Sequence, residues 1–234
     1  MGSARPHQWA GRELWVRYDG GHHMPIKQRR KLVSASPLID AAVCSLVLLA
    51  PDQPTYAALP EPVRSRFAHN TLALTAAAGI MDVPVFVSWP GPDRPVLAPY
   101  LSPGATYRHF TAGDYRSLWD NPAFVAELTE ENRTAVLIGG FWLEYQVLAT
   151  GLHALADAYD VYVLSDAARA QSRAAALTSH NRLMMQGARP ALTSQVIHEW
   201  SVAADQAKHT GLERLLEGLL PGRTPIGSGL VASL

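Results

Sequence analysis

The fold of this chain is decided by the stretch Thr134-Ala135-Val136-Leu137-Ile138-Gly139-Gly140, the clearest β-strand in the sequence. It is a short apolar run that ends at paired glycines. Such a run is typical of a strand that is covered on both faces, as in a parallel sheet. Residues 43–49 form a similar run. We expect both strands at the centre of the sheet, because an edge strand would expose apolar side chains.

Helices and strands alternate on both sides of this stretch. Residues 121–131 predict a helix before it, with Pro122 at the favoured first helical position, and residues 143–156 predict a helix after it. The other predicted strands are residues 83–87, 106–110, 160–164 and 189–192, and the other predicted helices are residues 70–80, 172–186, 194–208 and 211–219. This alternation requires right-handed crossovers, so it predicts an α/β fold: a three-layer α/β/α arrangement with a six-stranded parallel sheet of Rossmann-like topology.

The two ends of the chain differ from this α/β domain, which we place at residues 38–222. Residues 1–37 are polar, basic and without a helical or strand period, so they predict an extended or partly disordered leader, and Met24 is an alternative start. Residues 223–234 predict an apolar C-terminal tail. This tail either lies across a neighbouring subunit or is a frayed end.

Composition excludes several classes of partner. Lys plus Arg and Asp plus Glu both number 20 in 234 residues, so charge gives no reason to expect nucleic acid or an anionic membrane as a partner. No apolar stretch reaches the length of a membrane span, and the N-terminus has no signal-peptide core. The single cysteine, Cys44, excludes an intrachain disulfide and is interpreted as a small buried side chain. We therefore expect a cytoplasmic protein.

A binding site in an open α/β sheet is expected at the carboxyl ends of the strands. The segments predicted there are residues 50–53, 88–91, 111–120, 139–146 and 165–166. The histidines are scattered, and no Cys/His cluster or carboxylate pair has ligand spacing, so we expect no metal and no cofactor. Asp160 and Asp166 are interpreted as strand-end caps.

Four segments resemble one known family. Residues 137–150, which include Phe141-Trp142-Leu143-Glu144-Tyr145-Gln146-Val147, are similar to the signature of the isochorismatase-like (cysteine hydrolase) family: a strand, a glycine, a turn and a helix whose first turn ends in Cys-Val. Residues 159–167 match the following strand with its Asp-Ala pair, and residues 181–188 match the next helix with its Gly-Ala exit. Residues 118–124 resemble the Trp-Asp-Asn segment of the octameric branch. The resemblance covers residues 38–221 and implies a homo-oligomer, from a dimer to an octamer.

The resemblance also implies a catalytic set, and this chain departs from it at every position. Family members use a cysteine thiolate at the start of the helix after the fourth strand, an aspartate after the first strand and a basic residue after the third. The matching positions here are Gln146, Pro51 and a position near Ala112, with Arg108 and Arg116 close in sequence. A glutamine amide is not a covalent nucleophile and a proline carries no proton, so the usual mechanism is excluded.

Two acids near these positions could support non-covalent catalysis. Asp52 follows Pro51 directly and becomes the proton donor if the proline directs it inward, while Gln146 holds a water or a substrate carbonyl. Glu144 is the second candidate; its structural alternative is a carboxylate that is stabilised at a helix N-terminus. We expect the substrate to contact Pro51, Gln53, Trp89, Arg116, Phe141, Trp142 and Tyr145.

Three classes of function follow, in order of preference. The aromatic residues suit an apolar or cyclic metabolite, so the first is a non-covalent hydrolase, lyase or cyclase/isomerase, which would fit secondary metabolism. The second is a pseudoenzyme that binds a small molecule or acts as a scaffold, because all three catalytic positions are lost together. The third, a nucleic-acid or regulatory partner bound through the basic leader, is disfavoured by the zero net charge.

Overall fold

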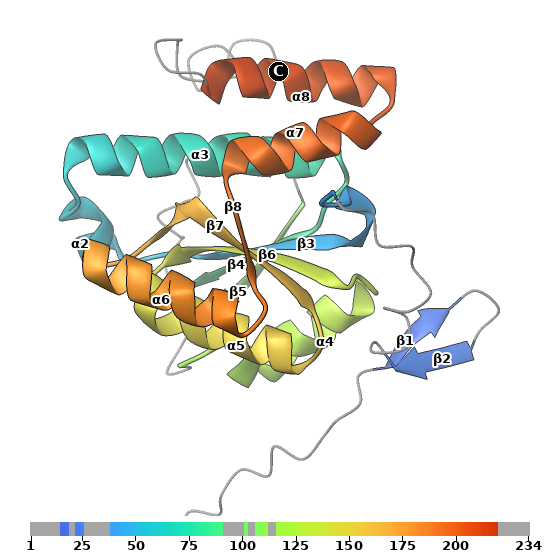
Figure 1. Ribbon diagram of the computed structural model, residues 1–234, viewed down its shortest axis with the longest axis horizontal. Helices are drawn as coiled ribbons and strands as arrows, with labels where there is room; N and C mark the ends of the chain where they lie inside the picture. The colour runs from blue at the N-terminus through green and yellow to red at the C-terminus, as the bar shows by residue number, and fades with distance from the viewer. Residues whose placement is uncertain are drawn as a thin grey trace, which may run out of the picture.

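A computed structural model (Figure 1) describes residues 15–18, 22–25, 38–90, 101–102, 106–111 and 116–219. The main sheet has six strands: β3 (Cys44–Leu49), β4 (Val85–Trp89), β5 (Tyr107–Thr111), β6 (Ala135–Phe141), β7 (Asp160–Arg169) and β8 (Arg189–Ala191). All neighbours pair in parallel, in the order β5-β4-β3-β6-β7-β8. The predicted fold class is confirmed, and β3 and β6 occupy the two central positions, as expected for strands that are apolar on both faces.

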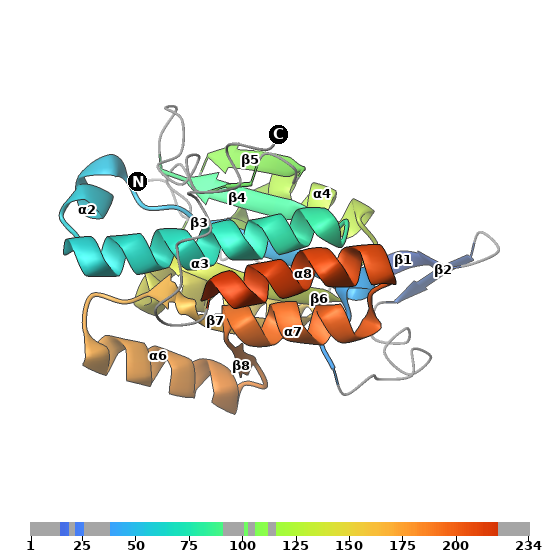
Figure 2. The ribbon, with the colours of Figure 1, turned by 90° about the horizontal axis from the view of Figure 1, so that it is seen from above.

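Helices cover both faces of this sheet. One layer holds α3 (Glu61–Ile80), α7 (Thr193–Ala203) and α8 (Gln206–Leu219), and the other holds α4 (Pro122–Glu130), α5 (Leu148–Ala156) and α6 (Arg173–Met185) (Figures 1 and 2). Short helical segments complete the chain: η1 (Ala41–Val43), α2 (Gln53–Ala57), η3 (Leu118–Asp120) and the π-helical turn η4 (Leu143–Val147).

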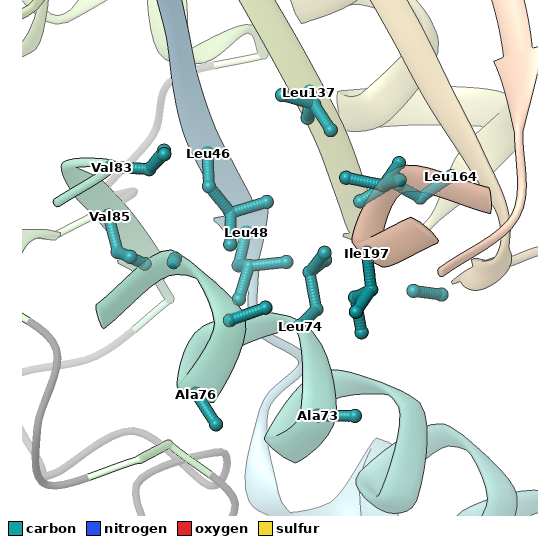
Figure 3. Packing of buried hydrophobic residues seen from close by; sticks show 14 of the residues in the cluster. Leu46, Leu48, Ala73, Leu74, Ala76, Val83, Val85, Leu137, Leu164 and Ile197 are labelled. Carbon is teal, nitrogen blue, oxygen red and sulfur yellow. The ribbon is translucent and has the colours of Figure 1, made fainter. Parts of the chain in front are cut away.

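Alternate residues of the central strands form two separate hydrophobic cores. Leu46 and Leu48 of β3 pack with Leu74 of α3 and Ile197 of α7 (Figure 3). Val47, the residue between them, belongs to the core on the opposite face, together with side chains of α4, α5 and α6. Side chains of a strand point alternately to its two faces, so β3 carries apolar side chains toward both cores, with Ser45 as its one buried polar residue.

Several element boundaries differ from the sequence prediction. Helix α3 begins at Glu61, not at residue 70, because Pro60 and Pro62 start a helix whose first turns are polar and largely exposed. Strand β7 continues to Arg169, five residues further than predicted. The pairing of β7 with β6 shifts in register between Ile138 and Gly140 of β6, and β7 continues beyond this shift. Hydrophobic periodicity in the sequence cannot reveal such a shift.

The N-terminal region also differs from the prediction. Residues 1–37 were expected to lack regular structure, yet β1 (Trp15–Tyr18) and β2 (His22–Pro25) pair as an antiparallel hairpin. Its register places Tyr18 opposite His22, around a short connection. The predicted C-terminal tail, residues 223–234, lies outside the described residues. None of the helices that the structure describes is both long and apolar enough to cross a membrane.

Candidate active site

The carboxyl ends of β4, β3 and β6 lie side by side and bring the predicted segments together. Leu49 pairs with Ser88 of β4 on one side and with Gly140 of β6 on the other. The Ala50 amide continues the pairing by donating to the Ser88 carbonyl oxygen over 2.7 Å. Pro51, Trp89 and the Phe141–Trp142 pair therefore follow three adjacent strand ends, the expected position for a ligand in an open α/β sheet.

Gly140 allows the chain to turn out of β6 toward the site. Its φ of +112° lies in a region that residues with a side chain rarely adopt. A Cβ atom placed there would lie 2.5 Å from the Leu49 amide nitrogen and closer still to the Leu49 carbonyl oxygen. Only glycine lets β6 approach β3 this closely. One residue further along, the peptide bond between Phe141 and Trp142 is cis.

Glu144 lies in the π-helical turn η4, directly after this peptide. One of its carboxylate oxygens, Oε1, accepts a hydrogen bond of 2.9 Å from the Gln171 amide. The other oxygen, Oε2, is buried and has no hydrogen-bond partner in the described part of the chain. A buried polar atom without a partner is rare and often marks a functional position. This oxygen can accept a proton, or donate one when the carboxyl group is protonated.

Aromatic side chains surround this turn, but they differ in exposure. Phe141 is 2% exposed and lies edge-on to Phe67 of α3 at 4.8 Å between ring centroids, so it fills the core. The ring centroid of Trp142 lies 5.2 Å from that of Phe141, and the Trp142 side chain is only partly buried. Tyr145 is 56% exposed. Trp89 contacts the His109 ring at 5.0 Å, and its buried indole Nε1 has no partner among the residues described. Trp142, Tyr145 and Trp89 are thus the aromatic candidates that a ligand can reach.

Asp52 has a structural contact in this conformation. It is exposed and stands at the N-cap of α2, where its carboxylate accepts a hydrogen bond of 2.7 Å from the Thr55 amide. Pro51 is buried beside it, and Gln53 begins α2 with a side chain outside the described part of the structure. The role of Asp52 as a proton donor stays a prediction.

The remaining predicted residues occupy different places. Gln146 lies half-buried in η4, two residues after Glu144. Arg116 is exposed, and the next residue, Ser117, contacts His153 of α5 over 2.9 Å. Ala112, the position that matches the basic residue of the family, lies outside the described residues. The structure therefore brings Gln146 close to Glu144, and it shows no described contact between Arg116 and either residue.

Cys44 is the first residue of β3 and is fully buried, in agreement with its interpretation as a small buried side chain. Burial raises the pKa of its thiol far above the usual range, and Asp40 adds to this effect. Six residues of strand separate it from Ala50, about 20 Å at a rise of about 3.3 Å per residue. A thiol in this position is neither ionised nor within reach of Gln146.

We expect iodoacetamide to leave Cys44 unmodified in the native protein, because alkylation requires an accessible thiolate. Intact-mass spectrometry in native buffer should show the unmodified chain, and the same treatment after unfolding in guanidinium should add a single carbamidomethyl group. Rapid alkylation in native buffer would contradict the buried position of the side chain.

Two residues of β7 have roles that the sequence did not reveal. Asp166, predicted to cap its own strand, instead accepts hydrogen bonds from the amide and the hydroxyl of Thr193 at 2.9 and 3.0 Å, so it anchors the start of α7. Arg169 ends β7 directly opposite Phe141. A sequence prediction that extended this strand to residue 169 would have included Arg169 among the strand-end residues. The predicted strand ends at residue 164. No group of three metal-ligating side chains occurs within the described ranges.

Comparisons with known proteins agree with this architecture. Residues 53–195 match the family model of the isochorismatase domain. The YcaC gene product of Escherichia coli, described as an octameric hydrolase of unknown specificity, is 22% identical with a TM-score of 0.68, over 81% of this chain and 94% of that one. YcaC from Pseudomonas aeruginosa, solved with hexane-2,5-diol and covalent acrylamide, is 21% identical with a TM-score of 0.68, over 85% and 98%. The MAR1 ribonuclease of Caenorhabditis elegans is 19% identical with a TM-score of 0.66, over 80% and 99%. No curated protein sequence matches this chain.

Proposed function

The chain belongs to the isochorismatase family, and from this premise we propose that it is a cytoplasmic enzyme that works without a covalent intermediate. The reaction is of the hydrolase, lyase or cyclase/isomerase type, and the substrate is a small, largely apolar or cyclic metabolite, as in secondary metabolism. Solved structures of such low identity support the fold, so the proposal rests on the residues of the site.

The loss of the nucleophile supports a non-covalent reaction. Gln146 stands where the resemblance places the cysteine, and an amide cannot act as a covalent nucleophile. Cys44 is buried at the opposite end of β3 and cannot replace it. The amide of Gln146 can instead orient a water molecule or a substrate carbonyl.

The observation that carries the proposal is the buried Oε2 of Glu144 without a described partner. The hydrogen bond from Gln171 fixes the carboxyl group and leaves this oxygen for a ligand. A positioned carboxyl group can transfer a proton to or from a substrate. Trp142 and Trp89 add apolar surface nearby, which suits a cyclic substrate held by shape more than by charge.

The experiment that tests the proposal is a screen for turnover. Purified protein is incubated with a panel of cyclic vinyl ethers, lactones, esters and epoxides, and loss of each compound is followed by liquid chromatography and mass spectrometry. We expect at least one compound to be consumed while the intact mass of the protein stays unchanged during turnover. A covalent adduct that accumulates and decays would contradict the mechanism.

A binding function without turnover is the second candidate, and the position of Asp52 favours it. The family aspartate is replaced by Pro51, and Asp52 caps α2 at the surface, so Glu144 remains the acid that the structure places at this turn. In this case the panel would yield ligands that bind and are not consumed.

We further propose that the chain forms a homo-oligomer. Helix α6 exposes Leu177, Met184 and Met185, at 56%, 41% and 85%, and several exposed apolar side chains on one helix are consistent with a protein interface. The octameric assembly of the E. coli relative supports the same conclusion.

Light scattering at micromolar concentration should return a multiple of the 25.4 kDa chain mass, and Met185→Glu should reduce the mass that light scattering measures. A wild-type mass near that of one chain would exclude the oligomer.

A further inference from the structure

We propose that Arg169 binds an anionic oxygen group of the ligand, with a carboxylate as the simplest case. The inference deepens the proposed function, because it concerns the same site and specifies one chemical feature of its ligand.

Arg169 carries a charge that no described residue neutralises. Its side chain is half-buried, its Nε is fully buried without a hydrogen-bond partner among the described residues, and no described carboxylate lies at ion-pair distance. By contrast, Arg108, Arg133 and Arg189 each pair with a carboxylate. A buried N–H donor without a hydrogen-bond partner is unfavourable, so the buried Nε of Arg169 is best explained by a ligand that supplies an acceptor.

The position of Arg169 places this charge at the site. It pairs with Phe141 across β6 and β7, and paired residues lie on the same face of a sheet. Phe141 belongs to the core under α3, and Trp142 packs on its ring. Arg169 therefore lies beside the turn where β6 leads into η4.

Glu144 and Arg169 together offer a ligand complementary contacts. The Gln171 amide, two residues after Arg169, holds Oε1 of Glu144, so the two segments are joined. Arg169 Nε presents an N–H donor and Glu144 Oε2 presents an acceptor, and both lack described partners. An anionic oxygen would bind the guanidinium, and a reacting group on the same ligand would lie toward Glu144. Arginine suits this role because its fork of donors matches the geometry of a carboxylate.

The test uses the full chain with benzoate and benzamide, two planar probes of the same shape that differ in charge. Isothermal titration should show that the wild type binds benzoate at millimolar concentration or below and prefers it to benzamide by about tenfold or more. Arg169→Met should abolish this preference. Arg173→Met, which removes an exposed arginine four residues further along, should leave the preference unchanged.

Thermal unfolding separates this role from a structural one. A methionine in place of an unpaired, partly buried charge should leave the melting temperature of the ligand-free protein unchanged or raise it, because no described contact is lost. The proposal is overturned if Arg169→Met keeps the benzoate preference, if it melts well below the wild type, or if the wild type does not prefer benzoate. Binding is measured without turnover, so a protein that prefers benzoate and consumes nothing would contradict the proposed enzymatic function alone.

Discussion

Gly140→Ala is expected to lower the free energy of unfolding by more than about 3 kcal/mol, at the large end of single substitutions. The added Cβ would lie 2.5 Å from the Leu49 amide nitrogen, so the central strands β3 and β6 would have to separate. Alanine is also strained at a φ of +112°. Because both strands are completely buried, the displacement would disturb both cores. Urea unfolding followed by circular dichroism measures the loss.

Gly187→Ala is the matched control for this substitution. Gly187 also has a positive φ, of +102°, but a Cβ there would meet nothing within 4 Å. The control therefore contains the backbone strain without the steric overlap and should destabilise by only about 1–2 kcal/mol. Equal losses of unfolding free energy for the two variants would show that the steric overlap with β3 contributes nothing to the destabilisation.

Glu144→Gln is expected to reduce turnover of whichever compound the panel identifies by about 10²-fold or more. Glutamine has nearly the same shape, and its carbonyl oxygen can still accept the hydrogen bond from the Gln171 amide. The substitution therefore removes the proton that the carboxyl group transfers and retains the position of the side chain. Initial rates at saturating substrate measure the effect, with the melting temperature as evidence that the variant folds.

Asp52→Asn is the comparison variant, because asparagine also caps helices and should keep the contact with the Thr55 amide. If it retains activity while Glu144→Gln loses it, Glu144 is the proton donor. The opposite result would transfer that role to Asp52. Full activity in both variants would exclude acid–base catalysis by either residue and leave shape or desolvation as the source of any rate enhancement.

Much of the fold was predictable because the central strands carry an unambiguous pattern. Strand β6 and residues 43–49 are almost continuously apolar, with the buried Ser45 as the exception, and such runs are typical of strands buried on both faces. The paired glycines after Ile138 marked the end of the strand, and Gly140 is indeed the residue that the close approach of β3 requires. Exposed helical turns were less predictable: the first turns of α3 are polar, so they carry no hydrophobic signal.

The expected position of the site follows from the sequence, whereas the surroundings of its residues do not. The alternation of strands and helices predicts a site at the carboxyl ends of the strands, and in the structure Trp142, Glu144 and Gln146 follow the carboxyl end of β6. The sequence did not predict the position of the Asp52 side chain, because Asp52 caps α2 through a hydrogen bond that forms only once the helix is in place. Arg169 was missed because the extra residues of β7 leave no trace in the hydrophobic pattern.

The sequence by itself therefore determined the fold class, the central strands and the absence of a nucleophilic side chain at residue 146. These properties depend on residue type and on spacing along the chain. Only the tertiary structure decided which polar groups find partners. Arg133 binds the carbonyl oxygens of Ala41, Cys44 and Asp82, whereas Arg169 has no described partner. Both are arginines next to strands, and they differ only in what the folded chain places around them, since hydrogen bonds and burial depend on distances in space.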